Sequence, residues 1–75
     1  MNITGERIRQ ARLLSAMTQN ELSAKLELMP LYICRGSLSR IENGLRYVHD
    51  FELDAICNIL GVSYDFLFGK SDSPE

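Results

Sequence analysis

The stretch from Thr18 to Gly44 decides the fold, and it reads Thr-Gln-Asn-Glu-Leu-Ser-Ala-Lys-Leu-Glu-Leu-Met-Pro-Leu-Tyr-Ile-Cys-Arg-Gly-Ser-Leu-Ser-Arg-Ile-Glu-Asn-Gly. Thr18 and Glu21 match a capping box, in which a hydroxyl and a carboxylate bond each other's backbone amides at a helix start. Asn43 and Gly44 are typical of a helix stop. Pro30 disfavours helix between these two signals. The stretch therefore predicts two short helices joined by a turn.

Each of these two helices has an apolar side. In the first, Leu22 and Leu26 are expected to be buried, with the small Ser23 letting another helix approach closely. In the second, expected over residues 35–43, Leu38 and Ile41 face inward and the other side is polar.

Helical spacing of apolar residues continues on both sides of this pair, and runs of alternating β-branched residues are missing. We expect a first helix over 3–15 with Ile8, Ala11 and Arg12 on one face. Asp50 is expected to cap a fourth helix that ends at Gly61, and Ser63 to cap a short last helix over 64–68. The prediction is an all-α, compact five-helix protein.

Length and composition place the chain among small globular proteins. Its 75 residues allow one domain, expected over 1–69 with a flexible polar tail over 70–75, and 45% are hydrophobic while 24% are charged. No apolar run approaches the roughly 18 residues of a membrane span, and the start of the chain lacks a signal peptide's apolar core. We expect a cytoplasmic protein that does not bind a membrane.

The sequence offers little support for a catalytic or metal-binding site. His49 is the only histidine, and the chain shows no glycine-rich phosphate loop or catalytic triad pattern, so no enzyme activity, cofactor or small-molecule ligand is predicted. Cys34, His49 and Cys57 do not have zinc-finger spacing. The two cysteines are interpreted as reduced and structural.

Charge is unevenly distributed along the chain. The net charge is -2, but residues 1–46 hold seven basic and four acidic residues, whereas residues 47–75 hold one basic and six acidic residues. The first part is therefore +3 and the second -5. A local contact with a polyanion is compatible with this distribution.

Three segments together resemble a known family: Thr18-Gln-Asn-Glu-Leu-Ser23, Leu38-Ser-Arg-Ile-Glu-Asn-Gly44 and Leu60-Gly-Val-Ser63. They are similar to the helix-turn-helix domain of the Cro and phage-repressor (XRE-like) family, over residues 3–69. The resemblance implies a lambda-repressor-like fold with the helix-turn-helix in helices 2 and 3. It also implies a sequence-specific regulator of transcription that binds double-stranded DNA, expected to be a repressor.

The resemblance implies roles for individual residues. Those expected to read bases are Arg35, Ser37, Ser39 and Arg40, and those expected to contact phosphate are Thr18, Gln19, Asn43, Arg46, Tyr47 and His49. Arg12 and Glu42 are expected to form a structural ion pair. Alternatives stay open. Arg35 or Arg40 can contact phosphate only, Gln19 can be solvated, and Asn43 can serve only as the helix stop.

The chain departs from the family pattern in its turn. About five extra residues lengthen it within 27–33, and we expect their apolar side chains to pack against Leu13 and Leu14. Cys34 stands where the family has a hydroxyl cap. Gly36 stands where the family often has a base-reading side chain, so direct readout uses fewer contacts or the backbone approaches the DNA more closely.

A domain of this size covers one face of the major groove, so a homodimer on a two-fold operator is expected. The resemblance points to Val62, Tyr64 and Phe66 as interface candidates, with the alternative that Phe66 folds onto its own domain. The alternative function is a protein-interaction module, such as an antitoxin-like autoregulator that binds a protein partner.

Overall fold

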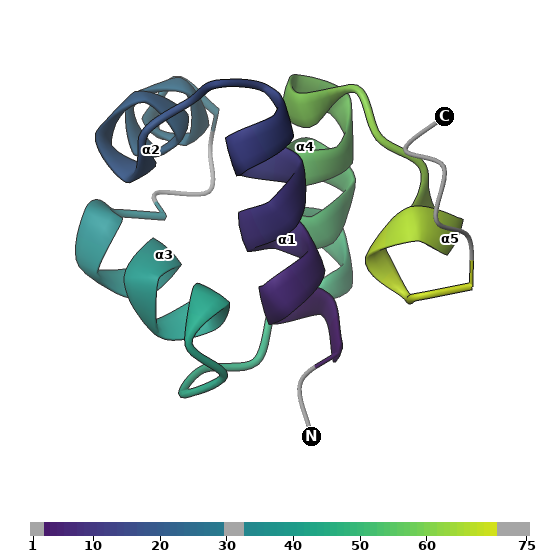
Figure 1. Ribbon diagram of the computed structural model, residues 1–75. Coiled ribbons are helices and arrows are strands. Elements are labelled where there is room, and N and C mark those ends of the chain that lie inside the picture. The colour runs from purple at the N-terminus through teal and green to yellow at the C-terminus, as the bar shows by residue number, and fades with distance from the viewer. Residues whose placement is uncertain (1–2, 30–32, 71–75) are drawn as a thin grey trace.

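The computed structural model describes residues 3–29 and 33–70, and these residues form five helices and no strand (Figure 1). The helices are α1 (Ile3–Leu14), α2 (Gln19–Glu27), α3 (Arg35–Glu42), α4 (Asp50–Leu60) and α5 (Tyr64–Leu67). The predicted all-α, five-helix fold is confirmed. Residues 30–32 of the lengthened turn lie outside the described residues, as does the predicted polar tail beyond Lys70.

Helix α1 is the central element of the fold. It contacts α3, α4 and α5, and Figure 1 shows α2 and α3 on one side of it and α5 on the other. Ile8, Ala11 and Arg12 are buried on one face of α1, as the spacing predicts. The described residues hold no helix long and apolar enough to cross a bilayer.

The local signals in the sequence place the helix ends well. Helix α2 starts at the predicted capping box, and Leu22, Ser23 and Leu26 are its buried residues. The Ser23 hydroxyl donates a hydrogen bond to the Ile33 carbonyl at 3.4 Å, so α2 is tied to the segment that leads into α3. The Ser63 hydroxyl accepts the Phe66 amide at 3.2 Å and caps α5 as expected.

The start of α4 differs by one residue from the prediction. The N-cap is His49, and Asp50 is the first helical residue. The Asp50 carboxylate accepts the neighbouring Phe51 amide, and the Glu52 carboxylate reaches back to the His49 amide, both at 2.8 Å. The carboxylate three residues after the N-cap thus accepts a hydrogen bond from the backbone amide of the N-cap residue.

The core is formed by apolar residues from every helix and from the segment before α3. Its fully buried large side chains are Ile8, Leu22, Leu26, Ile33, Leu38, Ile41, Ile56 and Leu67. The sequence predicted that the apolar side chains of the lengthened turn pack against Leu13 and Leu14. This prediction is wrong for Leu28, which is 88% exposed, and Leu13 and Leu14 themselves remain more than half exposed. Met29 instead packs against the core.

Both cysteines are free thiols, in line with the reduced state expected from the sequence, but they differ in position. Cys57 is buried in α4, where burial raises the pKa of its thiol. Cys34 is exposed at the N-cap of α3 and makes no side-chain cap bond, so only Cys57 has the structural position expected of both.

Candidate nucleic-acid interface

The start of α2 is fixed by reciprocal hydrogen bonds. The Thr18 hydroxyl accepts the Glu21 amide at 3.1 Å, and the Glu21 carboxylate accepts the Thr18 amide at 3.0 Å. The hydrogen bond from the Thr18 amide, with a smaller contribution from the Thr18 side chain, holds the pKa of Glu21 below its usual value.

A buried ion pair joins α1 to α3. The Arg12 guanidinium donates to the two carboxylate oxygens of Glu42, at 2.8 Å from Nε and 3.0 Å from Nη2. Its Nη1 donates to the Met17 carbonyl at 2.8 Å. The Arg12 and Glu42 side chains are only 9% and 1% exposed, so the pair is screened from solvent.

Gln19 joins this ion pair. Its side-chain amide donates to Glu42 Oε1 at 3.1 Å, which places the first residue of α2 against the end of α3. One amide hydrogen of Gln19 is therefore committed inside the protein. The sequence predicted a phosphate contact here and missed this bond, because the partner lies 23 positions away.

A hollow of about 540 Å³ lies beside the start of α2. It is lined from three segments, by Arg12, Leu13, Ala16, Met17, Thr18, Gln19, Asn20 and Arg35. The fold thus brings a predicted base-reading residue, Arg35, to the same hollow as the predicted phosphate contacts Thr18 and Gln19.

The outer side of α3 carries two guanidinium groups. Arg35 and Arg40 are exposed, and neither guanidinium group has a hydrogen-bond or ion-pair partner within residues 3–29 and 33–70. Glu42, the acidic residue of this helix, is buried and already paired with Arg12. Two cations on α3 are therefore available to a ligand.

The two serines of α3 are half-buried and make local contacts. Ser39 Oγ accepts Asn43 Nδ2 at 3.4 Å. Ser37 Oγ lies 3.5 Å from the Cys34 sulfur, and hydrogen bonds from Ser37 hold the pKa of the Cys34 thiol below its usual value. Both hydroxyls lie next to the exposed side of the helix.

The stop of α3 has the geometry that the Asn43–Gly44 pattern predicts. Gly44 adopts a left-handed φ of 76°. Its amide donates to the Ile41 carbonyl at 3.1 Å, and the Leu45 amide donates to the Arg40 carbonyl at 2.8 Å, which together form a Schellman motif. Asn43 is exposed just before this turn.

Arg46 is held by an acidic residue. Its guanidinium donates to both Glu52 carboxylate oxygens, at 3.2 and 2.8 Å, and to the Tyr47 carbonyl at 3.3 Å. The hydrogen bonds to Glu52 raise the pKa of Arg46. In this structure Arg46 fastens the loop after α3 to α4. Its expected phosphate contact stays a prediction. The partner Glu52 was missed, although His49 and Glu52 have capping-box spacing.

The other two residues expected in this loop are open to solvent. Tyr47 is 78% exposed, and the exposed His49 ring stacks on Phe51 with 5.5 Å between ring centroids. They lie beyond the C-terminal end of α3, whereas Thr18 and Gln19 line the same hollow as Arg35, the first residue of α3.

The predicted dimer residues do not form one exposed surface. Phe66 is 2% exposed and packs in its own core under the Arg7 guanidinium, 4.9 Å from the ring centroid, so the alternative of a folded-in aromatic holds. Val62 is half-buried and Tyr64 is 46% exposed. The Tyr64 hydroxyl donates to Asp54, which raises the pKa of Tyr64 to about 12.

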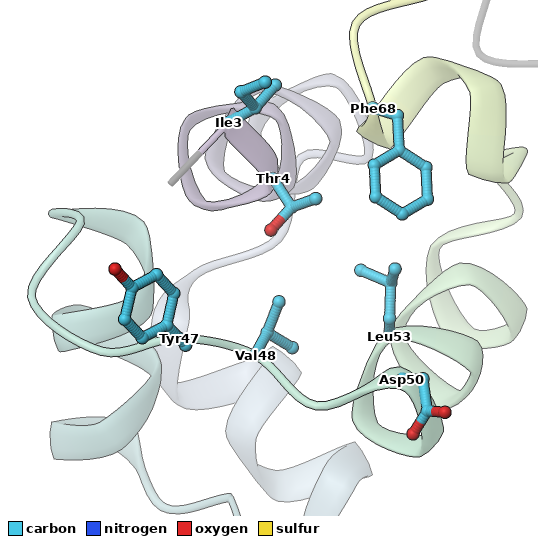
Figure 2. Close-up of a pocket in the computed structure, with 7 residues that line it drawn as sticks. All are labelled: Ile3, Thr4, Tyr47, Val48, Asp50, Leu53 and Phe68. Carbon is cyan, nitrogen blue, oxygen red and sulfur yellow. The ribbon is translucent and has the colours of Figure 1, made fainter. Parts of the chain in front are cut away.

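An apolar hollow of about 310 Å³, which the sequence did not predict, lies between the start of α1, the loop before α4 and the end of α5. It is lined by Ile3, Thr4, Tyr47, Val48, Asp50, Leu53 and Phe68. Figure 2 shows the Phe68 ring pointing toward Leu53, and Thr4 and Val48 pointing toward each other. Its lining joins Ile3 and Thr4 to residues at least 43 positions further along the chain, such as Tyr47, so no local pattern could reveal it.

Comparison with known proteins gives one result. A family model described as helix-turn-helix matches residues 8–67, from the middle of α1 to the end of α5. Searches of curated proteins and of solved structures gave no significant match. Because the match covers most of the chain and includes both helices of the predicted motif, the chain belongs to the helix-turn-helix family of Cro and phage-repressor-like (XRE-like) proteins.

Proposed function

We propose that this protein is a sequence-specific transcriptional regulator that inserts α3 into the major groove of double-stranded DNA. Membership of the family indicates a DNA-binding regulator. The observation that carries the proposal is the pair of exposed guanidinium groups, Arg35 and Arg40, on the second helix of the motif. Neither has a partner within the described residues.

Arginine suits this position because its planar fork donates two parallel hydrogen bonds to guanine O6 and N7. In the proposal Arg40 and Arg35 read bases, and the short hydroxyls of Ser37 and Ser39 contact neighbouring base edges. Preference for G·C pairs follows at the positions that the guanidinium groups reach.

Phosphates are held at both ends of α3 in the proposal. At one end, Thr18, Gln19 and the free amides of the first turn of α2 face a phosphate, which a helix N-terminus favours. At the other end, phosphates of the second DNA strand are contacted by Asn43, Tyr47 and His49. Arg46 contacts phosphate beside them and keeps this loop in place through its bonds to Glu52.

Two chains on a two-fold operator complete the proposal. The Cα extents of the described fold are 27 × 23 × 20 Å. Successive major-groove faces repeat about every 34 Å, so one domain fills one half-site. We infer a dimeric repressor with Val62 and Tyr64 near the subunit contact.

The proposal is tested by measuring affinity for duplex DNA as salt is raised. A phosphate grip predicts that log K falls linearly with log salt. A variant with both Arg35→Ala and Arg40→Ala is expected to bind at least roughly tenfold more weakly, since each bidentate contact contributes about 1 to 3 kcal/mol.

The matched control is the double variant Arg9→Ala and Lys70→Ala, which removes the same net charge at exposed positions away from α3. It is expected to bind nearly as well as the parent. Equal binding by the parent and the α3 variant, with both folded, would refute the assignment of α3. Duplexes selected by the parent from a random pool would then define the operator.

A protein-binding role is the second candidate. The exposed side chains of Leu13, Leu14 and Leu28 favour it, because apolar side chains of this size on a small domain are suited to a protein partner. A parent chain that binds no duplex even at low salt would favour this candidate over DNA binding.

A further inference from the structure

Gly36 lies at the centre of the solvent-facing side of α3. The buried residues of this helix are Leu38, Ile41 and Glu42. Since each residue advances about 100° around a helix, Gly36 and Arg40 point directly away from that buried stripe. Gly36 is exposed. The most outward position in the first turn of α3 therefore has no side chain.

The fold itself gives no reason for glycine at this position. The glycines with positive φ among the described residues are Gly44, Gly61 and Gly69, so Gly36 has an ordinary helical backbone. Of the described residues, a Cβ built on Gly36 would meet only the Cys34 sulfur, at 4.0 Å, which is normal van der Waals contact. An alanine fits the isolated domain.

Glycine also weakens the helix that carries it. It loses more backbone entropy on folding than any other residue. Helix α3 has only 8 residues, and its N-cap Cys34 makes no side-chain cap bond. A short, poorly capped helix thus keeps a destabilising residue at a place where the domain tolerates a better helix former. Such a residue is expected where a ligand must approach the backbone closely.

We propose that Gly36 is the point at which bound DNA comes closest to the α3 backbone, and that its missing side chain sets how deeply the helix enters the groove. This inference rests on the proposed DNA-binding function. A methyl group at position 36 would hold α3 away from the base edges. The reach of Arg35 and Arg40, on either side of Gly36 along the chain, would then fall short of their acceptors.

The test compares Gly36→Ala with the parent in thermal unfolding and in binding to the duplex that the parent selects from a random pool. Gly36→Ala is expected to raise the melting temperature by roughly 2 to 8 °C. It is expected to weaken DNA binding by about tenfold or more. Gly36→Leu, with a larger side chain of good helix propensity, is expected to bind more weakly still.

The matched control is Asn58→Ala, which also places a better helix former at an exposed position, on α4. It is expected to raise the melting temperature and leave DNA affinity unchanged, which separates greater stability from weaker binding.

Three outcomes would overturn the inference. If Gly36→Ala binds the duplex as well as the parent, the close approach is refuted while the proposed function stands. If Gly36→Ala melts at a lower temperature than the parent, the fold itself requires glycine at this position. If the parent binds no duplex, the proposed function fails and the inference falls with it.

Discussion

At the scale of single residues, the stability of the motif depends on the charges buried between its helices. Arg12 donates to Glu42 and to the Met17 carbonyl, and Gln19 adds a further donor to Glu42. A buried pair offsets the cost of desolvation only when its remaining polar atoms are also bonded. Within the described residues no buried side-chain nitrogen or oxygen lacks a partner. The pair therefore fixes how α1, α2 and α3 sit together.

Glu42→Gln is expected to destabilise the protein strongly, because it leaves the buried Arg12 guanidinium without its counter-charge. The expected loss is about 3 to 5 kcal/mol in the free energy of unfolding, measured by urea denaturation at pH 7. Glu27→Gln, at an exposed position of α2, is the control and is expected to change stability by less than about 0.5 kcal/mol. A small effect at Glu42 would show that the pair does not hold the helices together.

At the scale of helices, α1 and α3 end in the same hydrogen-bond pattern with different residues at the left-handed position. Helix α3 has Gly44 there, with φ 76°, and α1 has Ala16, with φ 53°. The Ala16 amide donates to the Leu13 carbonyl at 3.0 Å, and the next amide donates to the Arg12 carbonyl at 3.1 Å. A Cβ in this conformation is strained, at a cost of roughly 1 to 2 kcal/mol.

Ala16→Gly is therefore expected to stabilise the protein by up to about 1 kcal/mol, and Gly44→Ala to destabilise it by a similar amount. A Cβ on Gly44 would have no neighbour within 4 Å among the described residues, so its effect reports backbone conformation alone. Chemical denaturation of both variants measures the two changes. Changes of the same sign in the free energy of unfolding of the two variants would contradict the assigned helix ends.

The loop between α3 and α4 depends on the ionised form of Glu52. Burial alone would raise the pKa of Glu52, but hydrogen bonds from Arg46 and from the His49 amide outweigh it and hold the pKa below the ordinary 4.5. Because the folded pKa is depressed, the stabilisation is present above pH 4.5 and is lost as pH falls through the folded pKa.

Glu52→Gln is expected to lower the free energy of unfolding by about 1 to 3 kcal/mol relative to the parent at pH 7. The difference between the two proteins is expected to shrink as the pH is lowered below 4.5. Unfolding curves recorded from pH 7 to pH 3 measure it. A difference that stays constant over this range would mean that the charge of Glu52 does not contribute.

The sequence predicted those features of the helices that depend on neighbouring residues. Thr18 with Glu21, Ser63, and Asn43 with Gly44 mark helix ends through local bonds, and the structure has each of them. Partners that meet only in the folded chain could not be found in this way. Local spacing gives no sign that Gln19 bonds Glu42, and it does not distinguish an exposed Phe66 from a buried one.

At the scale of the whole molecule, charge and helix arrangement agree with one DNA-facing side. The part of the chain up to Arg46 carries +3 and includes α2 and α3, while the remainder carries -5. Figure 1 shows α5, within the acidic part, on the side of α1 opposite α2 and α3. In the proposed complex, α5 and its acidic Asp65 lie far from the phosphates.

Two chains are expected to bind each two-fold duplex, which sedimentation of the saturated complex measures. Tyr64→Ala is expected to weaken the binding of the second chain, since Tyr64 is exposed near the proposed contact. Phe66→Ala is expected instead to lower the stability of the single chain by about 3 to 5 kcal/mol, because Phe66 is a core residue here. One chain per duplex at saturation would rule out the dimer.

The measurement that tests the central claim most directly is the change in backbone amide resonances as the selected duplex is added to the labelled protein. The account predicts that the largest changes fall on the outer side of α3, at Gly36, Ser39, Arg40 and Asn43. It predicts small changes around the apolar hollow at Leu53 and Phe68. Large changes at that hollow, with α3 unaffected, would contradict the account.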